Sequence, residues 1–112
     1  KSILSIILGL LIMTTATRAA IKTERIEYKH GDIVLEGVLA YDDSVSGKRP
    51  GVLVCHEWWG NNEYAESRAK QIAGLGYVAF ALDMYGKGKK TTKGEEASAF
   101  LDPDERDHKA LC

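Results

Sequence analysis

Hydrophobic and polar residues alternate in two segments near the start of the chain. Residues 21–28 and 33–40 show this period of two, and the turn-forming sequence His-Gly-Asp at 30–32 separates them. The pattern predicts two antiparallel strands that form a hairpin. A polar surface loop rich in Asp, Ser, Gly and Pro is expected to follow over residues 41–50.

Two apolar runs farther along, 51–55 and 77–83, show no alternation. Such runs are typical of parallel strands covered on both faces, and we expect the first of them to lie in the middle of a sheet. The segment between them has helical periodicity. The order strand, helix, strand predicts a right-handed crossover unit and an α/β fold class.

The intervening helix is predicted over residues 63–75. Asn61 or Asn62 can cap its start, and Gly76 can end it. Helical spacing places a set of apolar residues on one face, which we expect to pack on the sheet: Ala65, Ala69, Ile72 and Ala73.

The last part of the chain is predicted to hold a Gly- and Lys-rich loop over residues 84–94 and a short helical turn over 95–101. The sequence Asp-Pro-Asp-Glu at 102–105 is a strong helix start, with a capping Asp and Pro at the first position. Little chain follows it, so we expect the 112-residue sequence to be a fragment.

Residues 1–19 are predicted to be a secretory signal peptide and not part of the fold. Lys1 supplies a positive charge, and residues 3–13 are largely apolar. As a helix that segment would span about 17 Å against about 30 Å of bilayer hydrocarbon, so a permanent span is disfavoured. Small residues place the cut after Ala19, which leaves residues 20–112 as an exported chain that meets the membrane transiently. An uncleaved interfacial anchor is the alternative.

Composition excludes several classes of protein. The chain is 45% hydrophobic and 28% charged, which excludes collagen-like and disordered chains. Its 15 basic and 16 acidic residues create no overall field that would attract nucleic acid. Two cysteines cannot form a disulfide framework. Cys55 lies within an apolar run and is interpreted as a small core residue, whereas Cys112 ends the chain without the glycines of a nucleophile bend.

Chemistry is expected in the loop His56-Glu57-Trp58-Trp59-Gly60, because ligands of open α/β sheets bind beyond the carboxyl ends of the strands. Desolvation beside two aromatic rings would raise the pKa of Glu57 and suit it to contact an acid or a nucleophile. Backbone amides leading into the next helix can donate to an oxyanion. On residue types alone the alternative stays open that both Trp rings pack over the sheet edge while Glu57 caps a turn.

No metal or cofactor is expected. His56-Glu57 is not followed by a second His at the spacing of a zinc protease helix. Four lysines of the Gly- and Lys-rich loop lack the phosphate-loop spacing, namely Lys87, Lys89, Lys90 and Lys93. The segment is interpreted as a solvated loop, with the rim of an anionic substrate site as the alternative.

Three stretches of the chain closely resemble the dienelactone hydrolase family, namely residues 49–62, 75–79 and 82–88, with Ala69 between the first two. The most specific parts are the His-Glu-Trp-Trp-Gly block and the later Asp-Met-Tyr-Gly turn. The resemblance implies the amino-terminal portion of an α/β-hydrolase fold, over residues 20–112.

In that family a Cys or Ser on a glycine-flanked bend attacks an ester or lactone carbonyl, activated by a His and an Asp that come later in the chain. The resemblance implies that Glu57 contacts the resting nucleophile, that the Trp58 amide supplies half of the oxyanion hole, and that Trp59 lines the substrate site. His56 is expected to orient the loop. Neither G-x-C-x-G nor G-x-S-x-G occurs in the sequence, so this chain is expected to be inactive by itself.

Two functions of different classes therefore remain after the sequence alone. The first is an exported hydrolase of a small-molecule ester or lactone, of which this chain is an amino-terminal piece. The second is a non-enzymatic exported module whose paired Trp58 and Trp59 bind a sugar. An inactive gene remnant differs from the first by lacking a continuation of the reading frame.

Overall fold

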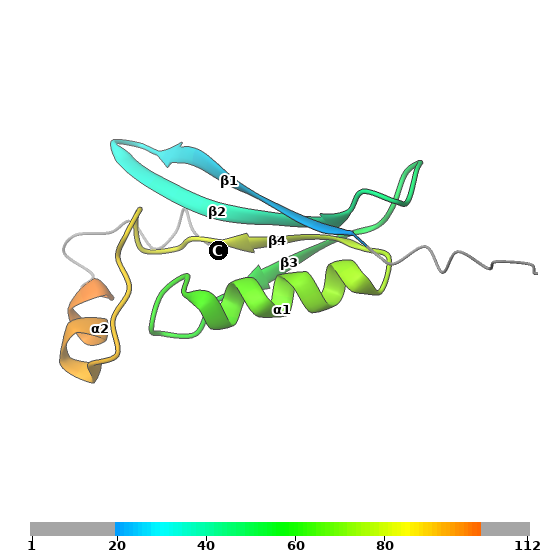
Figure 1. The fold of residues 1–112 in the computed structure, drawn as a ribbon. Coiled ribbons are helices and arrows are strands. Elements are labelled where there is room, and N and C mark those ends of the chain that lie inside the picture. Colours follow the sequence, from blue (N-terminus) through cyan, green and yellow to red (C-terminus); the bar gives the residue numbers. More distant parts are fainter. Residues whose placement is uncertain (1–19, 102–112) are drawn as a thin grey trace, which may run out of the picture.

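The computed structural model describes residues 20–101, which form a four-stranded sheet, one long helix against the sheet and one short helix beyond it (Figure 1). The predicted signal peptide and the predicted helix start at 102–105 lie outside the described residues. Within the described part of the chain, no helix is long and apolar enough to cross a bilayer. The elements are β1 Ile21–His30, β2 Ile33–Asp42, β3 Gly51–Cys55, α1 Glu63–Gly74, β4 Val78–Leu82 and α2 Gly94–Phe100.

Strands β1 and β2 form the predicted hairpin. They pair antiparallel from Ile21 opposite Asp42 to His30 opposite Ile33, so both strands run two residues farther than the alternating pattern indicated. Gly31 takes a φ of +57° in the connecting turn, a conformation that glycine adopts without steric cost.

The crossover unit is also present. Strands β3 and β4 precede and follow α1 in the sequence, and they pair in parallel. The sheet order is β1-β2-β4-β3. The α/β fold class is therefore confirmed. The expectation that residues 51–55 lie in the middle of the sheet is wrong for residues 20–101, because β3 is an edge strand there and β4 occupies the interior position. An apolar run indicates affinity for a covered position but does not specify which strands become its neighbours.

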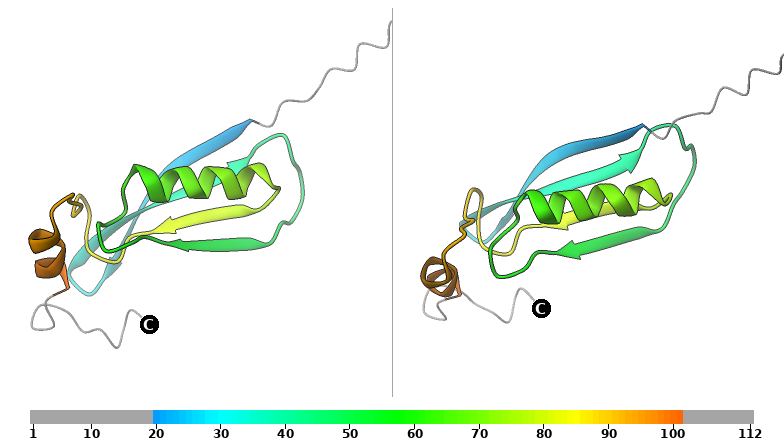
Figure 2. Two further views of the ribbon diagram at one scale, coloured as in Figure 1. Left: turned by 90° about the horizontal axis from the view of Figure 1, so that it is seen from below. Right: turned by 60° about the horizontal axis from the view of Figure 1, so that its bottom comes forward.

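The sheet has a covered face and an open face. On the covered face, α1 packs its small residues Ala65, Ala69 and Ala73 against the strands (Figures 1 and 2). These alanines let the helix approach the sheet closely, and the strand residues beneath it are nearly inaccessible: Val38, Ala40, Ala79 and Ala81. The open face carries the side chains that alternate with these, among them Leu39, Leu53, Cys55 and Phe80.

Cys55 lies on the open face and is exposed within residues 20–101, so its interpretation as a core residue is wrong. Alternation along β3 explains the difference. Val54 faces the covered side and packs against the core, whereas Leu53 and Cys55 face away from α1. Leu53 is 69% exposed.

Helix α1 begins and ends close to the predicted positions. Asn62 is its cap, with the side-chain oxygen accepting the Ala65 N–H at 3.2 Å. Gly76 follows the last turn with a φ of +97°, which ends the helix one residue before the predicted limit. Helix α2 coincides with the predicted helical turn to within one residue at each end.

Candidate active site

The loop that follows β3 is a tight turn. The Gly60 N–H donates to the Glu57 carbonyl oxygen at 3.1 Å. Gly60 has a φ of +96°, and a Cβ at this position would lie 2.4 Å from the Lys89 carbonyl oxygen. Glycine is therefore required here on two counts, and its bare backbone lets the turn pack directly against the loop that follows β4.

Asp83 anchors that second loop. Its side chain is buried, and one carboxylate oxygen accepts the N–H groups of Tyr85 at 2.9 Å and Gly86 at 3.1 Å. The other oxygen accepts the Glu36 N–H of β2 at 3.0 Å. The Tyr28 hydroxyl lies 2.8 Å from both the backbone N and the carbonyl oxygen of Asp83. A buried carboxylate with this many donors fixes where the chain leaves β4.

The Asn61 side chain links β2 and β4 at the end of their antiparallel pairing. Its side-chain amide donates to the carbonyl oxygens of Glu36 and Ala81, both at 3.2 Å. The sequence offered Asn61 and Asn62 as equal candidates for the helix cap, and the structure gives the cap to Asn62 alone. The links that Asn61 and Asp83 make to β2 were missed because Glu36, their shared partner, is distant in sequence. An Asp followed two and three residues later by Tyr and Gly was the local signal of a side-chain-capped turn.

The two loops are joined to each other. The Thr91 N–H donates to the Trp59 carbonyl oxygen at 3.0 Å, and the Met84 N–H donates to His56 Nε2 at 3.1 Å. The His56 ring also packs against Tyr85, with ring centroids 4.7 Å apart. These contacts are those expected of a His that orients the loop.

The structure brings Glu57, Trp58 and Trp59 together at the carboxyl end of β3. Glu57 has an exposed side chain within residues 20–101, which contradicts the expected desolvation. The reason is again the edge position of β3, which leaves the outer side of the loop without a neighbour. The carbonyl of Glu57 is instead well bonded, by Gly60 N–H and by His56 Nδ1 at 2.6 Å.

The two Trp rings do not form one flat surface. Their centroids are 4.7 Å apart and their planes are inclined by 51°. The Trp58 ring also lies against the start of α2, where a Cβ on Gly94 would come within 3.0 Å of it. The inclined rings therefore do not form a flat stacking platform for a sugar, and Trp58 remains 43% exposed. The Trp58 N–H, by contrast, has no hydrogen-bond acceptor among residues 20–101.

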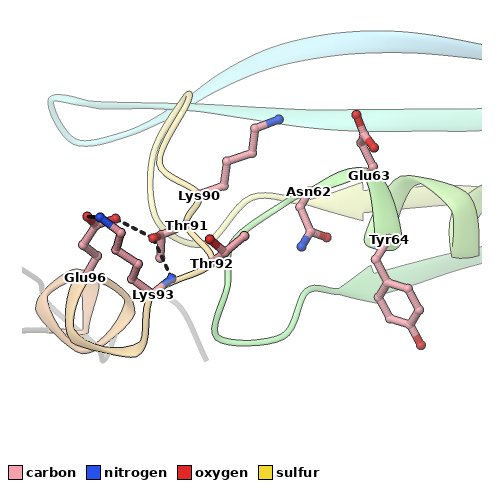
Figure 3. A pocket seen from close by; sticks show the side chains of 8 residues that line it. All are labelled: Asn62, Glu63, Tyr64, Lys90, Thr91, Thr92, Lys93 and Glu96. Atoms are coloured by element: carbon pink, nitrogen blue, oxygen red, sulfur yellow. Dashed lines mark hydrogen bonds and ion pairs between the residues drawn. The ribbon is translucent and has the colours of Figure 1, made fainter.

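A separate cleft of about 530 Å³ lies between the start of α1 and the loop before α2 (Figure 3). It is lined by neither Glu57 nor the Trp pair, and its two lysines are balanced by two glutamates. The cleft residues are Asn62, Glu63, Tyr64, Lys90, Thr91, Thr92, Lys93 and Glu96.

Lys87 lies outside this cleft. Its ammonium pairs with Glu27 and Glu36, in agreement with a solvated loop.

A search against family models matches residues 35–110 to the dienelactone hydrolase family. Among curated proteins, the chain is 37% identical over 78 residues to YghX of Escherichia coli (strain K12), which is described as a hydrolase fragment. That match covers 66% of this chain and 65% of YghX. The chain thus spans just under two thirds of this relative.

Two solved structures share the fold at similar levels. The m3DLH structure superposes with a TM-score of 0.69 and is 38% identical. The dienelactone hydrolase-like promiscuous phosphotriesterase P91 from metagenomic libraries has a TM-score of 0.68 and is 33% identical. Each match covers 73% of this chain but 34% of the solved chain, so the present chain spans about a third of either structure.

Proposed function

The chain belongs to the dienelactone hydrolase family and forms the amino-terminal portion of an α/β-hydrolase fold, and from this premise we propose that it supplies half of the oxyanion hole of an ester or lactone hydrolase. One observation carries the proposal. At the carboxyl end of β3, the Glu57 carbonyl is bonded by two donors while the Trp58 N–H beside it is unbonded within the described residues. A fixed, unoccupied amide at this place suits an oxyanion.

In the proposed reaction, a Cys or Ser beyond Cys112 gives its proton to a His farther along the chain and attacks the carbonyl carbon of the substrate. The π-electron pair of that carbonyl moves onto its oxygen, and the Trp58 N–H donates to the resulting oxyanion. The amide after the nucleophile is the second donor. Collapse of the tetrahedral species restores the carbonyl and expels the leaving oxygen, which takes the proton from the His. Water then gives a proton to the same His and attacks the acyl group, and the nucleophile leaves with that proton as the carboxylic acid is released. The exposed Glu57 carboxylate contacts the nucleophile at rest, and Trp59 lines the substrate site.

The proposal requires a longer natural polypeptide, which we call the parent polypeptide. Its continuation is proposed to encode a glycine-flanked Cys or Ser, then an Asp and a His, and the 112-residue chain alone is proposed to be inactive. The limited share of the solved relatives that this chain spans supports this view. Sequencing the coding region downstream of residue 112 tests it, and a stop codon directly after Cys112 would contradict it.

The oxyanion role is tested in the parent polypeptide by Trp58→Pro, which removes the N–H, and by Trp58→Phe, which removes the indole and keeps the N–H. Loss of one oxyanion donor costs about 100- to 1,000-fold in kcat. We expect such a loss in ester hydrolysis for Trp58→Pro and a change of a few fold for Trp58→Phe. Near-ultraviolet circular dichroism checks folding, and a folded proline variant with full activity would refute the role.

We further propose that the parent polypeptide is exported and cleaved after Ala19. The first strand begins at Ile21, and the Ala20 N–H donates to Asp42 Oδ1 at 3.3 Å. Cleavage would turn this N–H into an α-ammonium that faces the carboxylate, so the fold accommodates the new terminus. Amino-terminal sequencing of protein from periplasmic and culture fractions should find Ala20 first. A cytoplasmic protein with an intact leader would contradict export.

A further inference from the structure

The two ring nitrogens of His56 have partners of opposite kinds. The Met84 N–H lies 3.1 Å from Nε2, and the Glu57 carbonyl oxygen lies 2.6 Å from Nδ1. A backbone N–H can only donate and a carbonyl oxygen can only accept. Nε2 must therefore be without a proton, and Nδ1 must carry one. The contacts select the neutral Nδ1–H tautomer.

The imidazole is held in place by a packed neighbour. Its ring lies 4.7 Å from the ring of Tyr85, which is 4% exposed and itself packs 5.4 Å from Phe100. The Tyr85 N–H is bonded to the buried Asp83 carboxylate. Contacts with the anchored loop after β4 therefore fix the position of His56. His56 in turn bonds the loop after β3.

The bond from His56 also determines the direction of the Trp58 N–H. The Glu57 carbonyl and the Trp58 N–H belong to the same peptide unit, and no cis peptide occurs among the described residues. In a planar trans unit these two groups point in opposite directions. The donors on the Glu57 oxygen, His56 Nδ1 and Gly60 N–H, therefore fix the opposite direction of the Trp58 N–H.

We propose that His56 is a positioning residue whose Nδ1–H, by bonding the Glu57 carbonyl, holds the Trp58 amide in the orientation needed to receive an oxyanion. The catalytic consequence rests on the proposed function, whereas the tautomer and the peptide orientation do not. Oxyanion donors act because their direction is set before charge develops. Without His56, Gly60 alone would restrain this peptide.

The tautomer is tested by nitrogen NMR of the parent polypeptide labelled with ¹⁵N-histidine at neutral pH. We expect His56 to show a protonated Nδ1 and an unprotonated Nε2, and an Nε2–H tautomer would overturn the proposal. This readout needs no activity. A parent polypeptide that shows the Nδ1–H tautomer but hydrolyses no ester or lactone would refute the proposed function and leave the positioning geometry supported.

The catalytic consequence is tested by comparing His56→Asn with His56→Gln. The shorter Asn amide can keep an N–H near the position of Nδ1, whereas the Gln amide reaches toward Met84 and leaves the Glu57 carbonyl. We expect kcat for ester hydrolysis to fall about 10- to 100-fold in His56→Gln with KM nearly unchanged, and to stay within about fivefold of wild type in His56→Asn. His30→Asn, at the distant hairpin turn, should match wild type. Equal kcat values for the two His56 variants would overturn the positioning role.

Discussion

The two faces of the sheet come from the same strands but differ in what covers them. On the covered face, Val38 and Ala81 are at most 2% exposed under helix α1, while Leu53 on the open face is 69% exposed. Alternation along the strands supplies apolar side chains to both sides. Leu35 also lies on the open side of β2 but is 3% exposed. Among the described residues, the absence of a helix therefore accounts for the exposure of this face at β3 and not along its whole length.

Within residues 20–101, helix α1 covers one face of the sheet, and the other face stays partly open. The open face exposes apolar side chains, and β3 presents unpaired backbone groups along its outer edge within residues 20–101. An unpaired strand edge favours pairing with another strand, and an exposed apolar patch favours contact with another surface. The candidate active site follows the same edge strand, and Glu57 in that loop is exposed as well. We expect one continuation of the chain to cover both.

The largest expected effect is on the isolated chain. Residues 20–112 produced alone should aggregate or stay molten, because the open face and the β3 edge would meet water, and should show no esterase activity. Analytical ultracentrifugation and thermal unfolding would measure this, with the parent polypeptide as the control. A soluble monomer with sharp cooperative unfolding would mean that the open face needs no cover.

Leu53→Ala in the parent polypeptide should be the next largest effect. If the continuation buries the open face, the loss should be about 2 to 5 kcal/mol in the free energy of unfolding. Leu75→Ala is the matched control, because Leu75 is 77% exposed at the end of α1 and away from the open face. Its cost should stay within about 0.5 kcal/mol. Equal values in urea titrations would mean that Leu53 is solvated in the parent polypeptide too.

On the covered face, Ala69→Leu should overpack the contact between α1 and the sheet. Ala69 is fully buried, so the added methylenes have no free space, and we expect a loss of about 1 to 3 kcal/mol. Gln71→Leu makes a substitution of similar kind on the exposed side of α1 and should change stability by less than about 0.5 kcal/mol. An Ala69→Leu variant as stable as wild type would show that the covered face is loosely packed.

The smallest expected effect concerns Asp42, which continues the covered face at the end of β2. Hydrogen bonds from the Ser44 hydroxyl and N–H lower the pKa of the Asp42 carboxyl below its ordinary value. The folded state therefore binds a proton less readily than the unfolded state, so this carboxylate stabilises the fold above its unfolded pKa. That stabilisation is lost as the pH falls through the folded pKa. In the parent polypeptide, Asp42→Asn should reduce the loss in the free energy of unfolding that urea titrations measure as the pH is lowered. An unchanged pH dependence would show that Asp42 does not contribute to this loss.

Local sequence patterns determined the hairpin, the β3-α1-β4 order, and the limits of α1. Each depends on residues close together in the chain: alternation for the strands, the Asn62 cap and Gly76 for the helix. The place of the candidate site followed as well, because a loop after a parallel strand is located by that strand. The chemical roles of Glu57 and Trp58 came from family resemblance and remain proposals.

The tertiary structure alone decided the sheet order, the exposure of Cys55 and Glu57, and the bonds of Asn61 and Asp83. The bonds of Asn61 and the bond of Asp83 to β2 join residues twenty or more positions apart, and the exposures depend on which neighbour covers a strand. Periodicity reports that a side chain is apolar and which way it alternates. It carries no information on what lies opposite, because the neighbouring strand, loop or helix comes from a distant part of the sequence.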